Sequence, residues 1–300
     1  MSSNKFFKII NWRKLIYLIL IQLLFKICFL YDLGFETTIS SFFIFFLLSF
    51  ATVTMLASGY LISYYNKYKF DRVEEKVAKK AYSLGIFCSI ISIILVTFVS
   101  ISIGKPYHSF ISVIIALLLI AYLHYNTDKD FLSIVLEPCI NALCIFIIWW
   151  FDTPVNTTDE QWEEYFNFQL IAIVYIFLSI VGNIVYQIIK DIVNFNNDYI
   201  KNIKTLPVLL GRRRGKSIAL FFTVTGCLTV LGFAISCIDN IFILSIIFFM
   251  GTLPELCLIY LISKANTEKE FKKVLKMSNL TYLLGIVSIP LVAYYFRYAC

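Results

Sequence analysis

The chain has 300 residues, of which 60% are hydrophobic and 15% are charged, and its mean hydropathy is +0.81. So few charges exclude an ordinary water-soluble domain, whose surface needs polar cover, and favour a protein for which lipid is the solvent. The net charge of +7 comes with no nucleic-acid-binding motif and no base-stacking aromatics in the basic loops, so we expect no nucleic-acid partner.

Hydrophobic residues fall in continuous runs, many of them close to the length of about 20 helical residues that crosses a hydrocarbon layer. Continuous rather than alternating runs predict helices, because each backbone group in lipid needs a partner within its own segment. The predicted spans are Leu15–Tyr31, Phe42–Tyr64, Ala81–Ile103, Phe110–His124, Phe131–Trp150, Gln169–Ile189, Ser217–Ile238, Ile241–Ile262 and Leu280–Tyr295. The sequence therefore predicts an all-α fold, a single domain over residues 1–300 that forms a polytopic membrane bundle of about nine transmembrane helices.

The basic residues predict the orientation of this bundle. The N-terminal arm and the loops after the second, fourth, sixth and eighth spans hold 23 of the 26 Lys and Arg residues; the other three are Lys26, Lys105 and Arg297. Basic loops stay in the cytosol. We therefore expect a cytosolic N-terminus, a C-terminus outside, and attraction of the basic loops to anionic lipid headgroups of the bilayer.

Polar residues gather where the second and sixth spans end, on the predicted cytosolic side. Tyr64, Lys67 and Asp71 are spaced by three and four residues, which places them on one helical face. The sixth span ends with the same kind of spacing, in Asp191, Asn194 and Asp198. On spacing alone, solvated helix ends in basic loops explain both clusters, and a ligand site at a cytosolic mouth is the alternative.

The residues around Asp191 resemble a known signature. Lys190-Asp191-Ile192 and Asp198 are followed by Lys204-Thr205-Leu206-Pro207-Val208-Leu209-Leu210-Gly211. This pattern is similar to the second motif of the UbiA superfamily of intramembrane prenyltransferases, a DxxDxxxD helix end followed by a Lys-Thr-Leu-Pro-Val stretch. The first cluster, with Gly59, Tyr60 and Asp71 in register, resembles the family's NDxxDxxxD motif. Weaker similarities at Asn11–Leu15, Gln22 and Asn141 extend the resemblance over essentially the whole chain.

The resemblance implies a pocket that faces the cytosol, with a prenyl diphosphate whose tail lies inside the bundle and Mg²⁺ at the Asp-rich helix ends. It also implies transfer of the prenyl group to a hydrophobic or aromatic acceptor. The implied metal ligands are Asp191, Asn194, Asp198 and Asp71. The implied catalytic residues are Asp191, Asp198 and Lys67. The implied diphosphate-binding residues are Lys67, Lys190, Lys204 and Asn194.

The chain departs from the family pattern at several positions. Ser63, Tyr64 and Lys67 replace the Asn and the first two Asp of the first motif, and Asn194 replaces the middle Asp of the second. Tyrosine is a poor Mg²⁺ ligand at neutral pH and an ammonium repels the metal. We therefore expect no family-type metal site at the first motif and one Mg²⁺ at most at the second.

Three interpretations stay open. The first is an active, divergent prenyltransferase in which Lys67 contacts the diphosphate directly, since Lys binds phosphate. The second is an inactive relative that binds an isoprenoid lipid or a partner, with Lys67 paired to Asp191 or Asp198. The third is a transporter, which we favour least because charges inside the spans are confined to Lys26, Glu137 and Glu255 and no pair of broken helices is evident.

Overall fold

The computed structural model describes residues 6–7, 9–31, 36–68, 74–125, 131–200, 204–236 and 241–298. Over this part of the chain the fold is helical, and β pairing is limited to an isolated antiparallel bridge between Thr37 and Pro154. The chain divides into two compact units, Met1–Trp162 and Glu163–Cys300. A single domain over residues 1–300 stays a prediction.

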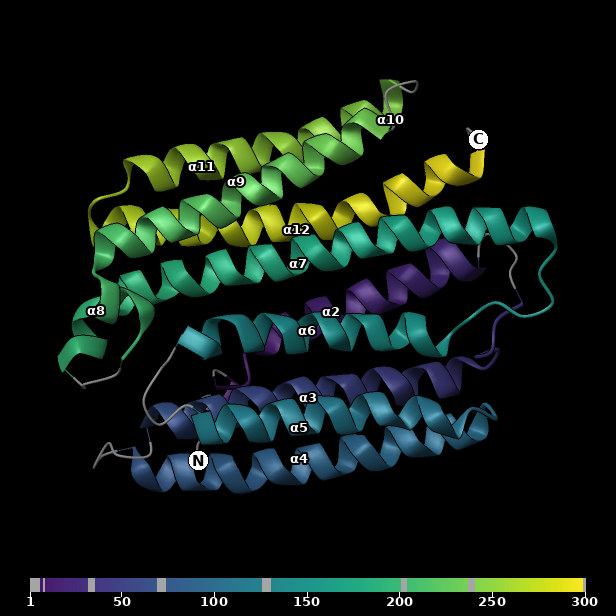
Figure 1. Cartoon of the computed structure of the whole chain (residues 1–300), viewed down its shortest axis with the longest axis horizontal. Helices are drawn as coiled ribbons and strands as arrows, with labels where there is room; N and C mark the ends of the chain where they lie inside the picture. Colours follow the sequence, from purple (N-terminus) through teal and green to yellow (C-terminus); the bar gives the residue numbers. More distant parts are fainter. Residues whose placement is uncertain are drawn as a thin grey trace. The chain divides into compact units, whose positions relative to one another are not determined.

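The first unit consists of five long helical segments. They are α2 (Trp12–Leu24) continued by the π-helix η1 (Phe25–Tyr31), α3 (Phe42–Tyr68), α4 (Glu75–Ser102), α5 (Phe110–Tyr125) preceded by the 3-10 helix η2 (Pro106–Ser109), and α6 (Phe131–Phe151). Helix α3 contacts α2, α4, α5 and α6, and Figure 1 shows α3, α4 and α5 side by side.

Small and hydroxyl-bearing residues bring α3 and α4 together. A Cβ on Gly85 would lie 3.1 Å from Ile62 Cγ1 and 3.4 Å from the carbonyl oxygen of Ser58, so a larger residue here would push against α3. Further along the pair, Ser92 Oγ donates a 2.6 Å hydrogen bond to the carbonyl of Ala51. The two helices are therefore held together up to the turn where the first polar cluster lies.

A buried amide connects three helices of this unit. Gln22 is 1% exposed, and its Nε2 donates to Thr52 Oγ1 at 2.9 Å and to the carbonyl oxygen of Cys144 at 2.8 Å. Because a buried polar group is costly unless it is hydrogen-bonded, these contacts specify how α2, α3 and α6 meet.

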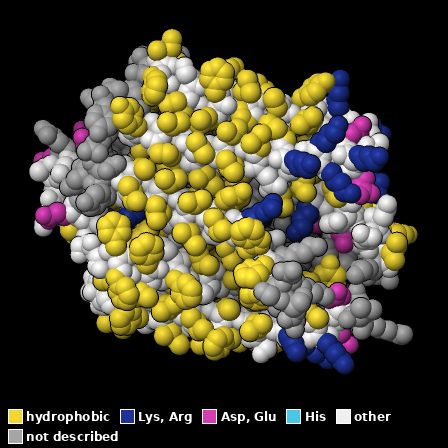
Figure 2. Space-filling view, turned by 180° about the vertical axis from the view of Figure 1, so that it is seen from behind, with side chains coloured by type: hydrophobic (Ala, Val, Ile, Leu, Met, Phe, Trp, Pro, Cys, Tyr) yellow, Lys and Arg dark blue, Asp and Glu magenta, His cyan; other side chains and the backbone are white. Residues whose placement is uncertain are grey.

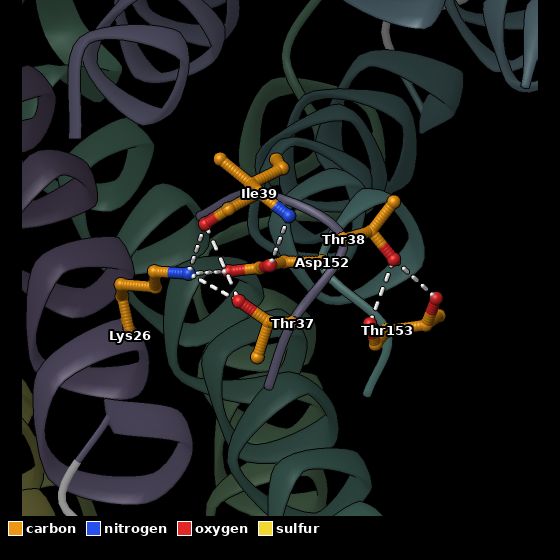
Figure 3. Close-up of polar contacts among 6 residues, drawn as sticks. All are labelled: Lys26, Thr37, Thr38, Ile39, Asp152 and Thr153. Carbon is orange, nitrogen blue, oxygen red and sulfur yellow. Dashed lines mark hydrogen bonds and ion pairs between the residues drawn. The ribbon is translucent and has the colours of Figure 1, made fainter. Parts of the chain in front are cut away.

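A polar clamp lies about one turn beyond Gln22 and joins η1, the segment before α3 and the residue after α6 (Figure 3). We use this name for Lys26, Thr37, Ile39 and Asp152. Lys26 Nζ contacts Asp152 Oδ2 at 2.5 Å and donates to Thr37 Oγ1 at 2.9 Å and to the carbonyl of Ile39 at 2.8 Å. Asp152 Oδ1 accepts the backbone N–H of Ile39 at 3.0 Å. All three ammonium hydrogens and both carboxylate oxygens are thus satisfied, which makes a buried ion pair tolerable.

The second unit contains most of a 42-residue helix and the chain that follows it. Its elements are α7 (Asp159–Ile200), α8 (Leu206–Leu210), α9 (Arg212–Ser236), α10 (Ile241–Ile246), the π-helix η3 (Ile247–Thr252), α11 (Leu253–Lys264) and α12 (Glu268–Tyr298). Helix α9 packs on η3 and α11, which also contact α12.

Two glycines form a close seam between α9 and the η3–α11 segment. A Cβ on Gly251 would lie 2.8 Å from Val230 Cγ1, and a Cβ on Gly226 would lie 3.8 Å from Glu255 Oε1. Each helix contributes one glycine and one larger residue four positions away, so the two pairs stack one turn apart along the seam.

The hydrophobic surface is that of a membrane protein. Among the residues that the structure describes, six helices are long and apolar enough to span a membrane, and shorter apolar helices cover Pro106–Leu118 and Pro138–Phe151. With α2 and η1, each predicted span falls on a helical segment wherever the structure describes the chain. Phe43, Phe221 and Phe249 are 69%, 67% and 64% exposed. Figure 2 shows hydrophobic side chains over much of the face in view, with Lys and Arg gathered toward one side. The predicted all-α, multi-pass membrane bundle is confirmed, whereas its orientation and the cytosolic pocket stay predictions.

Candidate active site

The last turns of α7 carry the second polar cluster on one face. Asp191 is 8% exposed, Asp198 is 4% exposed and Asn194 is half-buried between them. We call these three residues the acidic face of α7. A carboxylate so far removed from solvent stays ionised only beside hydrogen-bond donors, a cation or a metal. The spacing of three and four residues therefore predicted this face correctly, and burial marks it as unlike a solvated helix end.

The chain after α7 folds back against the last turns of α7. Pro207 lies in the first turn of α8, where its missing N–H costs nothing, and Gly211 ends α8 with φ 89°, a conformation that favours glycine. Helix α9 starts at once, and a Cβ on its Gly215 would lie 3.5 Å from Pro207 Cγ and 3.6 Å from Ile192 Cδ1. The first turn of α9 thus packs against Ile192, the residue that follows Asp191 in the sequence.

Two of the three lysines predicted to bind diphosphate belong to the same unit as the acidic face. Lys190 precedes Asp191 on α7 and is half-buried, whereas Lys204 is exposed just before α8. Lysine is a mobile point charge that suits phosphate oxygens. Their contact with a diphosphate stays a prediction.

The first polar cluster lies in the other unit and includes a carboxylate that the sequence analysis missed. Tyr64 Oη donates a 2.7 Å hydrogen bond to Glu74 Oε2, just before the start of α4. The ring of Tyr64 lies 4.7 Å from the ring of Tyr68. The side chain of Lys67, that of Glu137 and the whole of Asp71 lie outside the described part of the structure. The sequence offered one indication of Glu74: it is an acidic residue at the start of a helix, three positions after Asp71.

The two clusters differ in how well they fit a magnesium ion. The acidic face of α7 offers two carboxylates and an amide, the oxygen ligands that Mg²⁺ takes together with water and phosphate. Asp191 and Asp198 are about 10.5 Å apart along the helix axis. These three residues would hold a single ion at most, because a second one would need further carboxylates. Tyr64 does not fit, because its phenol is bonded to Glu74 and is not a ligand for a hard cation.

Further polar contacts continue along α7 within the hydrophobic part of the second unit. Tyr175 Oη and Ser288 Oγ of α12 are 2.7 Å apart, and Asn183 Nδ2 donates to the carbonyl of Ser179 at 2.9 Å. Tyr175, Ser179, Asn183, Gln187 and Asp191 are spaced by four residues and so form a row of polar side chains along α7. The sequence analysis missed this row, because single hydroxyl and amide groups hardly change the hydropathy of an apolar run.

Comparisons with known proteins agree with this architecture. A model described as the UbiA prenyltransferase family matches residues 24–280. A solved structure of a digeranylgeranylglyceryl phosphate synthase in membranes is 16% identical, with a TM-score of 0.67, and the match covers 98% of this chain and 99% of that one. At this identity the structural similarity shows the fold alone. The search of curated protein sequences gives no match.

Proposed function

Because the chain belongs to the UbiA prenyltransferase family, we propose that it transfers an isoprenyl group from a prenyl diphosphate to a hydrophobic or aromatic acceptor in the bilayer. In this reaction the bond between the prenyl C1 and the diphosphate oxygen breaks, and the diphosphate leaves with the electron pair. The acceptor forms the new bond to C1 and loses a proton. The observation that supports the proposal best is the pair of buried carboxylates on the acidic face of α7.

The proposed roles follow from charge. Asp191, Asn194 and Asp198 would hold one Mg²⁺, which neutralises charge on the leaving diphosphate. Lys190 and Lys204 would contact its oxygens as point charges. We propose that Lys67 supplies positive charge in place of a second metal, and that Asp71 is the remaining ligand of the first motif. Asn194 would add a neutral amide that helps to hold the ion or contacts the diphosphate.

A second candidate function is supported by the first cluster. Tyr64 occupies a position where family members carry a metal-binding Asp, and its hydroxyl is committed to Glu74. This arrangement favours a protein that binds an isoprenoid lipid or a partner without turnover. The two candidates differ in whether Mg²⁺ controls ligand binding.

Binding of labelled geranylgeranyl diphosphate to the purified protein, with and without a chelator, tests the proposal. Binding that is lost with chelator supports the transferase and leads to a screen of acceptors. Binding that ignores the chelator indicates capture by lysines without a metal. If geranylgeranyl diphosphate and its shorter and longer relatives all fail to bind, the transferase proposal is wrong, and the alternative of an inactive relative that binds an isoprenoid lipid or a partner stands.

A pair of substitutions then locates the metal. Asn194→Asp restores a third carboxylate on the acidic face and should lower the Mg²⁺ concentration needed for half-maximal binding by about 10-fold, or 1.4 kcal/mol. Asn197→Asp adds the same charge at an exposed position off that face and should have little effect. Asp191→Ala should abolish the Mg²⁺ dependence. Equal responses of Asn194→Asp and Asn197→Asp would place the metal elsewhere.

A further inference from the structure

We infer that Arg212 is a positioning residue that holds the acidic face of α7 in its ligand-binding register. This inference rests on the proposed function for its effect on Mg²⁺, but its structural basis is independent of it. The residue lies at the first position of α9, sixteen residues after Asn196. Nothing in the sequence distinguishes it from Arg213 and Arg214, which follow it.

The guanidinium of Arg212 holds the end of α7 by two contacts. Its Nη2 donates a 2.7 Å hydrogen bond to Asn196 Oδ1, and its Cζ lies 4.5 Å from the centroid of the Phe195 ring. Phe195 and Asn196 lie between Asn194 and Asp198, so the contacts lie within the segment that carries the acidic face. Cation–π stacking and a fork of donors are properties of arginine that lysine lacks.

The need for such a contact follows from helix chemistry. The last four carbonyls of a helix have no partner within it, so the final turn frays unless another element holds it. Asp198 lies in that final part of α7, which ends at Ile200. Loss of the last turn would separate Asp198 from Asn194 and destroy the shared face.

The neighbouring arginines offer matched controls. Arg212 is half-buried, and beside its two contacts with α7 its charge also acts on Glu268 at the start of α12. Arg213 and Arg214 are exposed. Replacing any one of the three removes the same charge from the same helical turn, and among the described residues the stack on Phe195 and the bond to Asn196 are contacts of Arg212.

The test compares Arg212→Met, Arg212→Lys and Arg213→Met in the full-length protein. For Arg212→Met we expect about 10-fold weaker Mg²⁺ support of geranylgeranyl diphosphate binding, as for other residues that orient metal ligands. Arg212→Lys keeps the charge and should also lose affinity, whereas Arg213→Met should match the wild type. Hydrogen exchange over residues 194–200 should rise in both Arg212 variants and not in Arg213→Met.

Two results overturn the inference: Mg²⁺ dependence of Arg212→Met equal to that of Arg213→Met, or wild-type behaviour of Arg212→Lys in both measurements. If Arg212→Met does not fold, Arg212→Lys decides. If the wild-type protein shows no Mg²⁺-dependent binding, the proposed function fails, and hydrogen exchange alone decides whether Arg212 holds the end of α7.

Discussion

Lys26 shows how this protein accommodates a full charge among apolar helices. Its side chain is 6% exposed and that of Asp152 is not exposed at all. The ammonium group and the carboxylate both have hydrogen-bond partners in addition to each other. The sequence analysis identified Lys26 as a charge inside a span but did not pair it with Asp152. A partner 126 residues away is set by packing and not by spacing.

Replacing one member of this pair should lower the stability of the protein far more than replacing both. Lys26→Ala or Asp152→Ala leaves a buried charge unpaired and should cost about 3–5 kcal/mol of stability, whereas Lys26→Met with Asp152→Leu should recover most of that loss. Thermal unfolding in detergent, followed by size-exclusion chromatography, measures both. A double variant less stable than either single variant would show that an unpaired buried charge is not what destabilises the single variants.

At the scale of elements, hydrophobic runs predicted where helices lie but not how they pack. The predicted span Gln169–Ile189 lies within the longer α7, because its polar ends continue the helix beyond the apolar run. The π-helices η1 and η3 were not predicted, since hydropathy does not report hydrogen-bond register. The acidic face was predictable because helical spacing alone brings it together. The contacts of Glu74 and Arg212 were not predictable, because each residue contacts the preceding long helix after the chain has turned back.

The seam between α9 and the η3–α11 segment gives a prediction at this scale. Gly251→Ala places a Cβ 2.8 Å from Val230 Cγ1 and should destabilise the protein by about 1–3 kcal/mol through overpacking. Gly232→Ala on α9 meets nothing within 4 Å and should be neutral or stabilising by about 0.5–1 kcal/mol. Thermal unfolding of the two variants, and of Gly251→Ala combined with Val230→Ala, measures this. No relief in the combined variant would exclude a clash at Val230.

For the whole molecule, the distribution of basic residues predicts an orientation. Lys and Arg concentrate in alternate loops, which should place the N-terminus and the loop around Lys204 in the cytosol and Cys300 outside. A reporter that is active only in the cytosol should therefore be active when fused after Lys204 and inactive when fused after Cys300. Activity at Cys300 would mean an even number of crossings or the reverse orientation.

The polar clamp also constrains how the protein is made. Lys26 lies in the span Leu15–Tyr31, and Asp152 follows the span Phe131–Trp150, so Lys26 is synthesised well before its partner. Until Asp152 has been synthesised, the Lys26 ammonium lacks the carboxylate that it contacts in the folded protein and must stay at the lipid–water interface or beside the insertion machinery. We therefore expect nascent chains that end before Asp152 to remain cross-linkable to the translocon through their first span, and chains that include it to be released into the bilayer.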